Sequence, residues 1–256
     1  MKVSIITLTY NSEEHILECL ESIKNQNYKE IEHIIIDGLS NDNTMKIIKK
    51  NSIKNSIIVS EKDGGIYDAW SKGFKKATGD IVGTLMSDDR LENNNVISTV
   101  VQSFNNNDCD ILYANMNFEF NNKIVRKWKP GLFRKRSFYF GWMPPPPTVY
   151  VKNKILNENA YFDKKYRIAG DYEWLLRLFF VKNYKIFYLD QFIYTLKMGG
   201  ISNSSFKNII QGNIECYQAW KDNNLSKFPI WVFLKPFTRL LQIKRIEEFF
   251  RFYFLK

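Results

Sequence analysis

The chain has 256 residues, with 37 lysines and arginines against 27 aspartates and glutamates, and therefore a formal net charge of +10. Its hydrophobic content of 45% is enough for a sizeable core. The length suits one domain with an appendage, or two small lobes. The positive charge favours anionic partners, such as nucleic acid, acidic lipid or a substrate that carries a nucleotide.

The histidines and cysteines argue against several kinds of site. The only two histidines are His15 and His33, so a histidine-based zinc site or a Ser-His-Asp triad has little support. Cys19, Cys109 and Cys216 form no CxxC motif, which fits buried thiols in a reduced, cytoplasmic protein. The N-terminal stretch MKVSIITLTYN is too short and mixed for a signal peptide, and no apolar run long enough to span a membrane is present.

The first hundred residues alternate between strand and helix patterns. Strands are predicted at Val3–Leu8, Ile31–Ile36, Ser56–Ser60 and Asp80–Met86. Helices are predicted after Ser12, through Ile16, Leu20 and Ile23, and at Asn41–Lys50 and Ile66–Ala77. This alternation predicts a parallel sheet with helices on both faces.

Polar residues and glycines follow each of the four predicted strands. The exits are Thr9-Tyr10-Asn11, Asp37-Gly38, Glu61 to Gly65, and Ser87-Asp88-Asp89. Turn preferences explain any one of them alone. Because parallel strands end at a common edge where ligands gather, four such exits in register predict a binding site.

The pair Asp88-Asp89 ends an apolar strand, and adjacent like charges repel each other. Paired carboxylates at such a position suit a hard divalent cation, Mn²⁺ or Mg²⁺. Neither a Walker motif nor a GxGxxG motif follows the first strand, so a metal rather than a glycine-rich loop is expected to hold phosphate. A nucleoside diphosphate that carries a transferable group fits this arrangement.

The second half of the chain has a different pattern. Short, antiparallel strands are predicted at Asp110–Ala114, Asn117–Phe120 and Ile124–Trp128, with a turn at Asn121-Asn122, and a further strand at Thr148–Val151. The four prolines at 144–147 predict a stiff, extended connector. A helix is predicted after Gly170, with Asp171 in its first turn, and another at Asn208–Lys221.

Four stretches resemble glycosyltransferase family 2: VSIITLTYN, IIIDGLSNDNT, EKDGGIYDAWSKGFKKATGDIVGTLMSDD and IAGDYEWLLRL. They occur in the family's order over roughly residues 1–200, and they are most similar to the bacterial O-antigen and colanic-acid branch. The resemblance implies an α/β GT-A fold, with a mixed, mainly parallel sheet flanked by helices. It implies a glycosyltransferase domain at 1–204, made of a nucleotide-sugar-binding half (1–115) and an acceptor-binding half (116–204). The change in residue character after about Ser205 predicts a C-terminal helical, amphipathic extension at 205–256.

The resemblance also implies a reaction and roles for particular residues. A sugar would pass, with inversion, from a nucleotide-sugar donor, commonly linked to UDP, to a hydroxyl of a lipid-linked or saccharide acceptor in bacterial surface polysaccharide synthesis. The implied donor-binding residues are Thr9, Tyr10, Asn11, Asp37, Asp63, Tyr67, Asp68, Lys72 and Asp88. Asp89 and Asp88 would bind Mn²⁺ or Mg²⁺, and Asp171 would be the catalytic base that takes the acceptor's proton.

This sequence departs from the family's pattern at three places, one of which is Ser71, where Asn is frequent. Many members have Asp or Asn at the position of Met86, whose thioether is a poor ligand for a hard cation. Many also have a histidine within the stretch that reads MPPPP here.

Simpler structural roles remain open for several of these residues. Asp37 and Asp63 both precede glycine and could be turn residues. Lys72 fits a solvated helix residue better than a ligand, and Asp171 could merely favour the start of its helix. Glu173 could compete as the base, although it would lie on a different face of that helix.

Two other functions compete with glycosyl transfer. A nucleotidyltransferase would require a phosphate loop rich in glycine and basic residues, and the first strand exit has none. A non-catalytic binder of nucleic acid or anionic surfaces would gather its basic residues on one face, whereas here they are spread along the chain without an RNA-binding or zinc signature, so we expect no nucleic-acid partner. The oligomeric state is left open.

The last segment, Phe228–Lys256, mixes aromatic residues with lysine and arginine. This composition fits the boundary between acidic headgroups and acyl chains. Because Pro236 would interrupt a long helix, two shorter pieces are expected. The segment therefore predicts peripheral contact with the inner leaflet of the cytoplasmic membrane.

Overall fold

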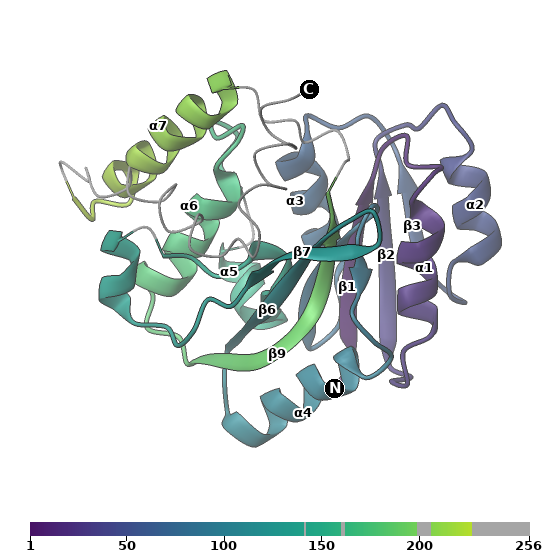
Figure 1. Ribbon diagram of the computed structural model, residues 1–256, viewed down its shortest axis with the longest axis horizontal. Helices are drawn as coiled ribbons and strands as arrows, with labels where there is room; N and C mark the ends of the chain where they lie inside the picture. Colours follow the sequence, from purple (N-terminus) through teal and green to yellow (C-terminus); the bar gives the residue numbers. More distant parts are fainter. Residues whose placement is uncertain (141, 160–161, 199–205, 227–256) are drawn as a thin grey trace.

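The computed structural model describes residues 1–140, 142–159, 162–198 and 206–226, and it forms one curled sheet flanked by helices (Figure 1). The strands are β1 (Val3–Thr9), β2 (Ile31–Asp37), β3 (Ile57–Ser60), β4 (Ile81–Met86), β5 (Arg90–Leu91), β6 (Ile111–Phe120), β7 (Lys123–Trp128), β8 (Tyr150–Lys152) and β9 (Ile186–Lys197). The α-helices are α1 (Ile16–Lys24), α2 (Thr44–Asn51), α3 (Ile66–Lys76), α4 (Val96–Asn107), α5 (Asn153–Asn159), α6 (Gly170–Leu176) and α7 (Phe206–Asp222). Two 3₁₀ turns, η1 (Lys135–Phe140) and η2 (Pro146–Thr148), and a π-helical turn, η3 (Arg177–Val181), complete the elements.

The strand order is β3-β2-β1-β4-β8-β6-β9-β5, with β7 paired to β6. Neighbouring strands from β3 to β4 are parallel, whereas β8 runs antiparallel to both β4 and β6. The predicted mixed, mainly parallel sheet is therefore confirmed.

The prediction of helices on both faces is also confirmed, by two adjacent residues of β1. The hydroxyl of Thr7 contacts the thiol of Cys19 in α1. A Cβ atom added at Gly73 in α3 would lie only 2.5 Å from the side chain of Ile6. Because successive side chains of a strand point to opposite faces, α1 and α3 cover opposite faces of the sheet.

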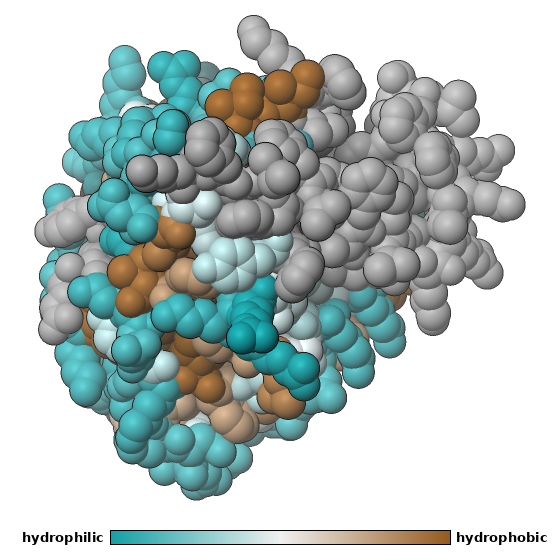
Figure 2. Space-filling view, turned by 90° about the vertical axis from the view of Figure 1, so that its left-hand side faces the viewer, coloured by the Kyte–Doolittle hydropathy of each residue, from teal (hydrophilic) through white to brown (hydrophobic). Residues whose placement is uncertain are grey.

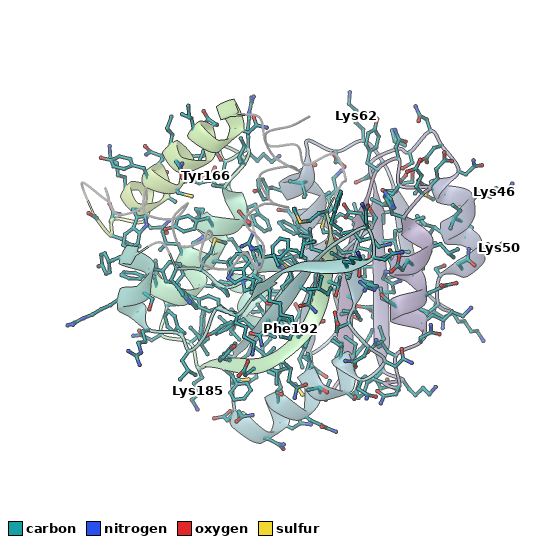
Figure 3. All side chains as sticks on the ribbon, in the orientation of Figure 1. Lys46, Lys50, Lys62, Tyr166, Lys185 and Phe192 are labelled. Carbon is teal, nitrogen blue, oxygen red and sulfur yellow. The ribbon has the colours of Figure 1, made fainter. Side chains whose placement is uncertain are left out.

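The carboxyl ends of the first four strands meet at one edge of the sheet. Thr9 pairs in register with Asp37, and Asp37 pairs with Ser60. Met86, the last residue of β4, lies opposite Leu8. This edge faces the top of Figure 1. Figure 3, in the same orientation, labels Lys62 on the loop after β3 at this edge, and it shows Lys46 and Lys50 projecting outward from α2. The four predicted strand exits therefore share one edge.

Two expectations about the second half were wrong in detail. The segments predicted as two strands form one continuous strand, β6, although its register with β9 shifts near Asn115. The hairpin from β6 to β7 turns at Asn121 and Asn122, both with positive φ, as the sequence predicts. Pro146 opens the turn η2 rather than extending a connector, because proline suits the first residue of a helical turn, where no N–H is needed.

Two α-helices and two strands had no prediction, namely α4, α5, β5 and β9, and the turn η1 had none either. Of these, β9 matters most for the edge described above, because its curvature carries it from β6 to the short strand β5. Tyr194 and Thr195 lie opposite Leu91 and Arg90, directly after the exit of β4. The helix predicted around Asp171 is α6, and it continues into the π-helical turn η3.

The helix α7 is close to its predicted position and packs against α6. Its residues Cys216, Ala219 and Trp220 are buried, whereas Ile210 and Ile214 of the same helix are 47% and 51% exposed. Figure 2, which views the side of the molecule that carries α7, shows hydrophobic atoms at the surface among hydrophilic ones. In the parts of the chain that the structure describes, no helix is long and apolar enough to cross a membrane. The segment Phe228–Lys256 lies outside the described residues.

Candidate active site

Asp37 is a buried carboxylate at the end of β2 that fastens the neighbouring strand exits together. It accepts hydrogen bonds from the Ser40 amide (3.1 Å) and from the Ser60 hydroxyl at the end of β3 (2.6 Å). Asn11 joins the same loop, because its amide donates to the Ser40 hydroxyl (2.8 Å) and its side-chain oxygen accepts from the Asn41 amide (2.9 Å). The structure therefore brings Asn11 and Asp37 together as predicted.

The predicted nucleoside-binding residues surround Gly38. The ring of Tyr10 and a carboxylate oxygen of Asp63 lie 3.3 Å and 2.8 Å from where a Cβ atom on Gly38 would sit. Tyr10 is 56% exposed, which leaves an aromatic face open beside polar groups. Thr9 lies next to Asp37 in register, and its buried hydroxyl has no hydrogen-bond partner among the described residues. An open ring beside polar groups suits a flat heterocyclic base.

Asp89 is 4% exposed at the exit of β4 and has few partners for a buried carboxylate. The Tyr194 hydroxyl (2.7 Å) and the Lys197 amide (3.0 Å) donate to its two oxygens. Burial, followed by the charge of Asp88, raises the pKa of Asp89 to about 8. The Lys197 amine pairs with Glu18 instead. The pair of aspartates is thus short of positive charge.

These two aspartates fit a divalent cation that shares its ligands with a substrate. Over the residues that the structure covers, no group of three or more His, Cys, Asp or Glu side chains could hold a metal. Asp88 and Asp89 would supply hard oxygen ligands for Mn²⁺ or Mg²⁺, and diphosphate oxygens would have to fill the other positions. Tyr194 and Lys197 fix the orientation of Asp89, as outer partners of metal ligands commonly do.

The start of α3 carries three further predicted donor-binding residues. Asp68 accepts a hydrogen bond from the Gly64 amide (3.1 Å), so it holds the loop that leads into the helix. The Lys72 amine lies 3.0 Å from Glu61 and 3.5 Å from Asp68. The Lys72 side chain, which is 23% exposed, is therefore held in ion pairs within the protein. Tyr67 instead reaches the segment before α6, where its hydroxyl donates to the Ile168 carbonyl (2.7 Å).

Asp171 lies in the first turn of α6, beside α3. A Cβ atom on the preceding Gly170 would come within 2.8 Å of the Tyr67 ring, so only glycine allows this close approach. One carboxylate oxygen of Asp171 accepts from the Tyr172 amide (2.7 Å). Asp171 also lines a small cavity with Trp70 of α3 and Thr84 of β4. The strand β4, which leads into Asp88 and Asp89, therefore passes the same cavity.

Glu173, the alternative base, is engaged elsewhere. Its carboxylate is 5% exposed, and both of its oxygens accept hydrogen bonds from the Arg177 guanidinium at 3.0 Å. With both oxygens engaged in this two-point ion pair, Glu173 links α6 to the turn η3. Asp171 is the better candidate of the two.

This arrangement agrees with the comparison against known families. Residues 4–210 match Glycosyl transferase family 2. The chain belongs to this family. The glycosyltransferase is 28% identical over 177 residues to an uncharacterized glycosyltransferase of Mycobacterium tuberculosis, with 68% of each chain covered. It is 24% identical over 236 residues to the glycosyltransferase GlyG of Streptococcus pneumoniae, with 80% of this chain and 74% of GlyG covered.

Solved structures resemble the glycosyltransferase in fold. A Staphylococcus aureus TarS fragment in complex with UDP-GlcNAc superposes with a TM-score of 0.68 at 21% identity, over 97% of this chain and 69% of that one. The mannosyltransferase PcManGT of Pyrobaculum calidifontis, in complex with GDP-Man and Mn²⁺, gives a TM-score of 0.60 at 16% identity, over 94% of this chain and 74% of that one. The fold of this glycosyltransferase is therefore GT-A.

Sequence reasoning missed several residues that shape the glycosyltransferase site. Ser40 and Ser60 satisfy Asp37, and Tyr194 holds Asp89. The stretch IFYLDQFIYTLK is rich in aromatic and branched residues, which could have predicted the strand β9. Its pairing with β5, which brings Tyr194 to Asp89, depends on the curvature of the sheet and has no local signal.

Proposed function

We propose that this glycosyltransferase transfers a sugar, with inversion, from a UDP-sugar to a hydroxyl of a lipid-linked or saccharide acceptor. The observation that carries the proposal is the pair Asp88 and Asp89, of which Asp89 is buried, short of positive charge at the edge where the nucleoside residues gather. The donor assignment is further supported by the TarS structures, which contain UDP and UDP-GlcNAc.

In this proposal the donor's nucleoside lies over the exits of the first three strands. Tyr10 stacks on the base, and Asp37 and Asp63 accept hydrogen bonds from it or from the ribose. The buried hydroxyl of Thr9 and the side chain of Asn11 complete the wall, and the unpartnered state of Thr9 Oγ supports a ligand contact there. The open ring of Tyr10 is available without rearrangement.

The other donor residues lie on the helix α3 and at the exit of β4. Tyr67, Asp68 and Lys72 form the outer wall, with Asp68 and Lys72 acting through the loop that they hold rather than through direct contact. Asp88 and Asp89 would hold Mn²⁺ or Mg²⁺, which would neutralise the charge of the departing diphosphate.

Asp171 takes the acceptor's proton in the proposed reaction. The acceptor oxygen attacks the anomeric carbon from the face opposite the diphosphate, and the bond from that carbon to the diphosphate oxygen breaks. The electron pair leaves with UDP, while the hydroxyl proton passes to the Asp171 carboxylate. Attack from the opposite face inverts the anomeric centre.

The wider role that we propose is synthesis of a bacterial surface polysaccharide, of the O-antigen, capsule or exopolysaccharide kind, at the inner leaflet of the cytoplasmic membrane. The composition of Phe228–Lys256 supports membrane contact. We also propose that residues 1–115 bind the donor, that residues 116–204 bind the acceptor, and that residues 205–256 form a C-terminal extension.

Removing residues 227–256 tests the membrane contact and should release the protein from vesicles that contain anionic lipid. Equal binding by the full and shortened proteins, or no binding by the full chain, would contradict this role.

A panel of UDP-, GDP- and dTDP-sugars tests the donor. We expect thermal stabilisation and slow hydrolysis with a UDP-sugar in the presence of Mn²⁺, and much weaker effects after chelation with EDTA. A preference for a GDP- or dTDP-sugar would overturn the nucleotide assignment, and equal activity in EDTA would overturn the metal assignment.

Asp171→Asn tests the base. We expect unchanged donor affinity and a loss of turnover of roughly 10³-fold, within the range for a general base. Asp163→Asn is the matched control, since Asp163 is a half-exposed carboxylate of the same segment that pairs with Lys165 (2.9 Å). Retained turnover in Asp171→Asn would remove the assigned role.

A further inference from the structure

Glu215 of α7 binds the backbone that leads into Asp171. Its carboxylate accepts hydrogen bonds from the amides of Ile168 (2.8 Å), Ala169 (2.8 Å) and Arg167 (3.2 Å). These are three consecutive amides, and the last of them lies two residues before Asp171. One buried side chain from a distant part of the sequence therefore fixes the segment that ends at the proposed base.

The contact is buried and charged. Glu215 is 5% exposed. Burial raises the pKa of Glu215, but the hydrogen bonds from the amides of Ala169 and Ile168 lower it by a larger amount. The pKa of Glu215 therefore lies below its ordinary value. The carboxylate is therefore ionised at neutral pH, and hydrogen bonds to a charged acceptor are the stronger kind.

The same segment is held from the opposite side by α3. The Tyr67 hydroxyl donates to the carbonyl of Ile168, whose amide donates to Glu215. Tyr67 also packs against Gly170, as described above. Ile168 is thus held between a side chain of the proposed donor wall and a side chain of α7, and Asp171 follows three residues later.

We propose that Glu215 is a positioning residue that sets the location of the Asp171 carboxylate relative to the bound donor. The inference rests on the proposed role of Asp171 as the base. Proton transfer during attack requires the base within hydrogen-bond reach of the acceptor hydroxyl, and an error of about 1 Å costs on the order of 10²-fold in rate. The amide of Glu215→Gln has one acceptor oxygen and presents N–H groups to a cluster of donors, so the segment shifts.

Asp222, at the end of α7, provides a matched control. It accepts a hydrogen bond from the Tyr166 hydroxyl (2.6 Å) and pairs with Lys165 (2.8 Å). Figure 3 labels Tyr166 beside α7. Asp222→Asn therefore weakens a similar link between α7 and the same segment, but five or more residues away from Asp171.

The experiment measures kcat, donor KM and melting temperature with Mn²⁺ and the most rapidly cleaved sugar of the donor panel. Glu215→Gln should lower kcat by roughly 10²-fold while the donor KM changes by less than about threefold. Glu215→Asp keeps the charge and should recover part of the loss. Asp222→Asn should lower the melting temperature to a similar extent, with kcat within about threefold of the wild type.

A double variant separates positioning from general stability. If Glu215 acts through Asp171, Asp171→Asn/Glu215→Gln should be no slower than Asp171→Asn alone. Equal kcat values in Glu215→Gln and Asp222→Asn, or additive losses in the double variant, would overturn the inference and leave the base assignment intact. Full turnover in Asp171→Asn would instead overturn the base assignment and this inference with it.

Discussion

The two edges of the parallel sheet treat a buried carboxylate in opposite ways. At the amino edge, Glu32 of β2 accepts hydrogen bonds from the Lys2 amine (2.6 Å), the Ser4 hydroxyl (2.6 Å) and the Thr78 amide (2.8 Å). Burial raises the pKa of Glu32, but these donors lower it by a larger amount, so that the pKa is about 2. The folded protein therefore stabilises the ionised form of Glu32.

At the carboxyl edge, Asp89 has a neighbouring carboxylate where Glu32 has a lysine. Burial and the charge of Asp88 raise its pKa to about 8, against the hydrogen bonds from Tyr194 and Lys197. The folded protein therefore disfavours the ionised form of Asp89. A fully partnered carboxylate such as Glu32 stabilises the structure, whereas an under-partnered one beside a second acid is what we propose as a metal ligand.

The largest expected effect is on activity at the carboxyl edge. Asp89→Asn removes a charged ligand, so we expect turnover with Mn²⁺ and the preferred donor to fall by roughly 10³-fold. Asp80→Asn, an exposed carboxylate just before the same strand, is the control and should remain within about threefold of the wild type. Near-normal turnover in Asp89→Asn would break the comparison.

The next effect is on stability at the amino edge. Glu32→Gln leaves a lysine, two hydroxyls and an amide facing a neutral side chain, and we expect it to lower the free energy of unfolding by about 2 kcal/mol. Urea denaturation measures this change. The exposed Glu30→Gln should change it by less than about 0.5 kcal/mol. If Glu32→Gln lowered the free energy of unfolding by as little as Glu30→Gln, the hydrogen-bond partners of Glu32 would contribute little to stability.

The pH dependence of Glu32 sharpens the comparison. Its pKa is lowered from 4.5 to about 2 on folding, so its stabilisation is complete above about pH 4.5 and disappears as the pH falls toward 2. The difference in unfolding free energy between wild type and Glu32→Gln should therefore shrink over that interval. A difference that stays constant from pH 6 to pH 3 would contradict the assignment.

A smaller effect is expected from Gly38→Ala at the carboxyl edge. The added Cβ atom would lie 2.8 Å from an Asp63 oxygen and 3.3 Å from the Tyr10 ring, so both side chains must shift. We expect the donor KM to rise by roughly tenfold, about 1.4 kcal/mol, with little change in kcat. Gly64→Ala is the control, because its nearest contact is an ordinary 3.6 Å. Equal KM values would exclude a role for these neighbours.

Much of the carboxyl edge could be predicted because it depends on local signals. Apolar runs predict β1, β2 and β4, and the polar residues after them share an edge in any parallel sheet. The position of Asp171 in the first turn of a helix also follows from the local pattern.

The remaining contacts depend on pairings between distant segments. Tyr194 reaches Asp89 from 105 positions later in the chain, and Glu215 reaches Ala169 from 46 positions later. The partners of Glu32 come from two distant segments, residues 2–4 and Thr78, so nothing in the sequence around Glu32 shows that its carboxylate is paired. The adjacent Asp88 marks Asp89 in the sequence, whereas the pairing of Glu32 is visible only in the folded chain.

The most direct test compares the melting temperatures of Asp89→Asn and Glu32→Gln at pH 7 without divalent cations. Because folding disfavours the charge of Asp89 and favours that of Glu32, the two variants should shift in opposite directions. Without divalent cations, we predict an unchanged or higher melting temperature for Asp89→Asn and a lower one for Glu32→Gln. When Mn²⁺ and UDP are added, we predict that Glu32→Gln is stabilised like the wild type and that Asp89→Asn is not. A clear decrease for Asp89→Asn, or normal stabilisation of it by Mn²⁺ with UDP, would contradict the account.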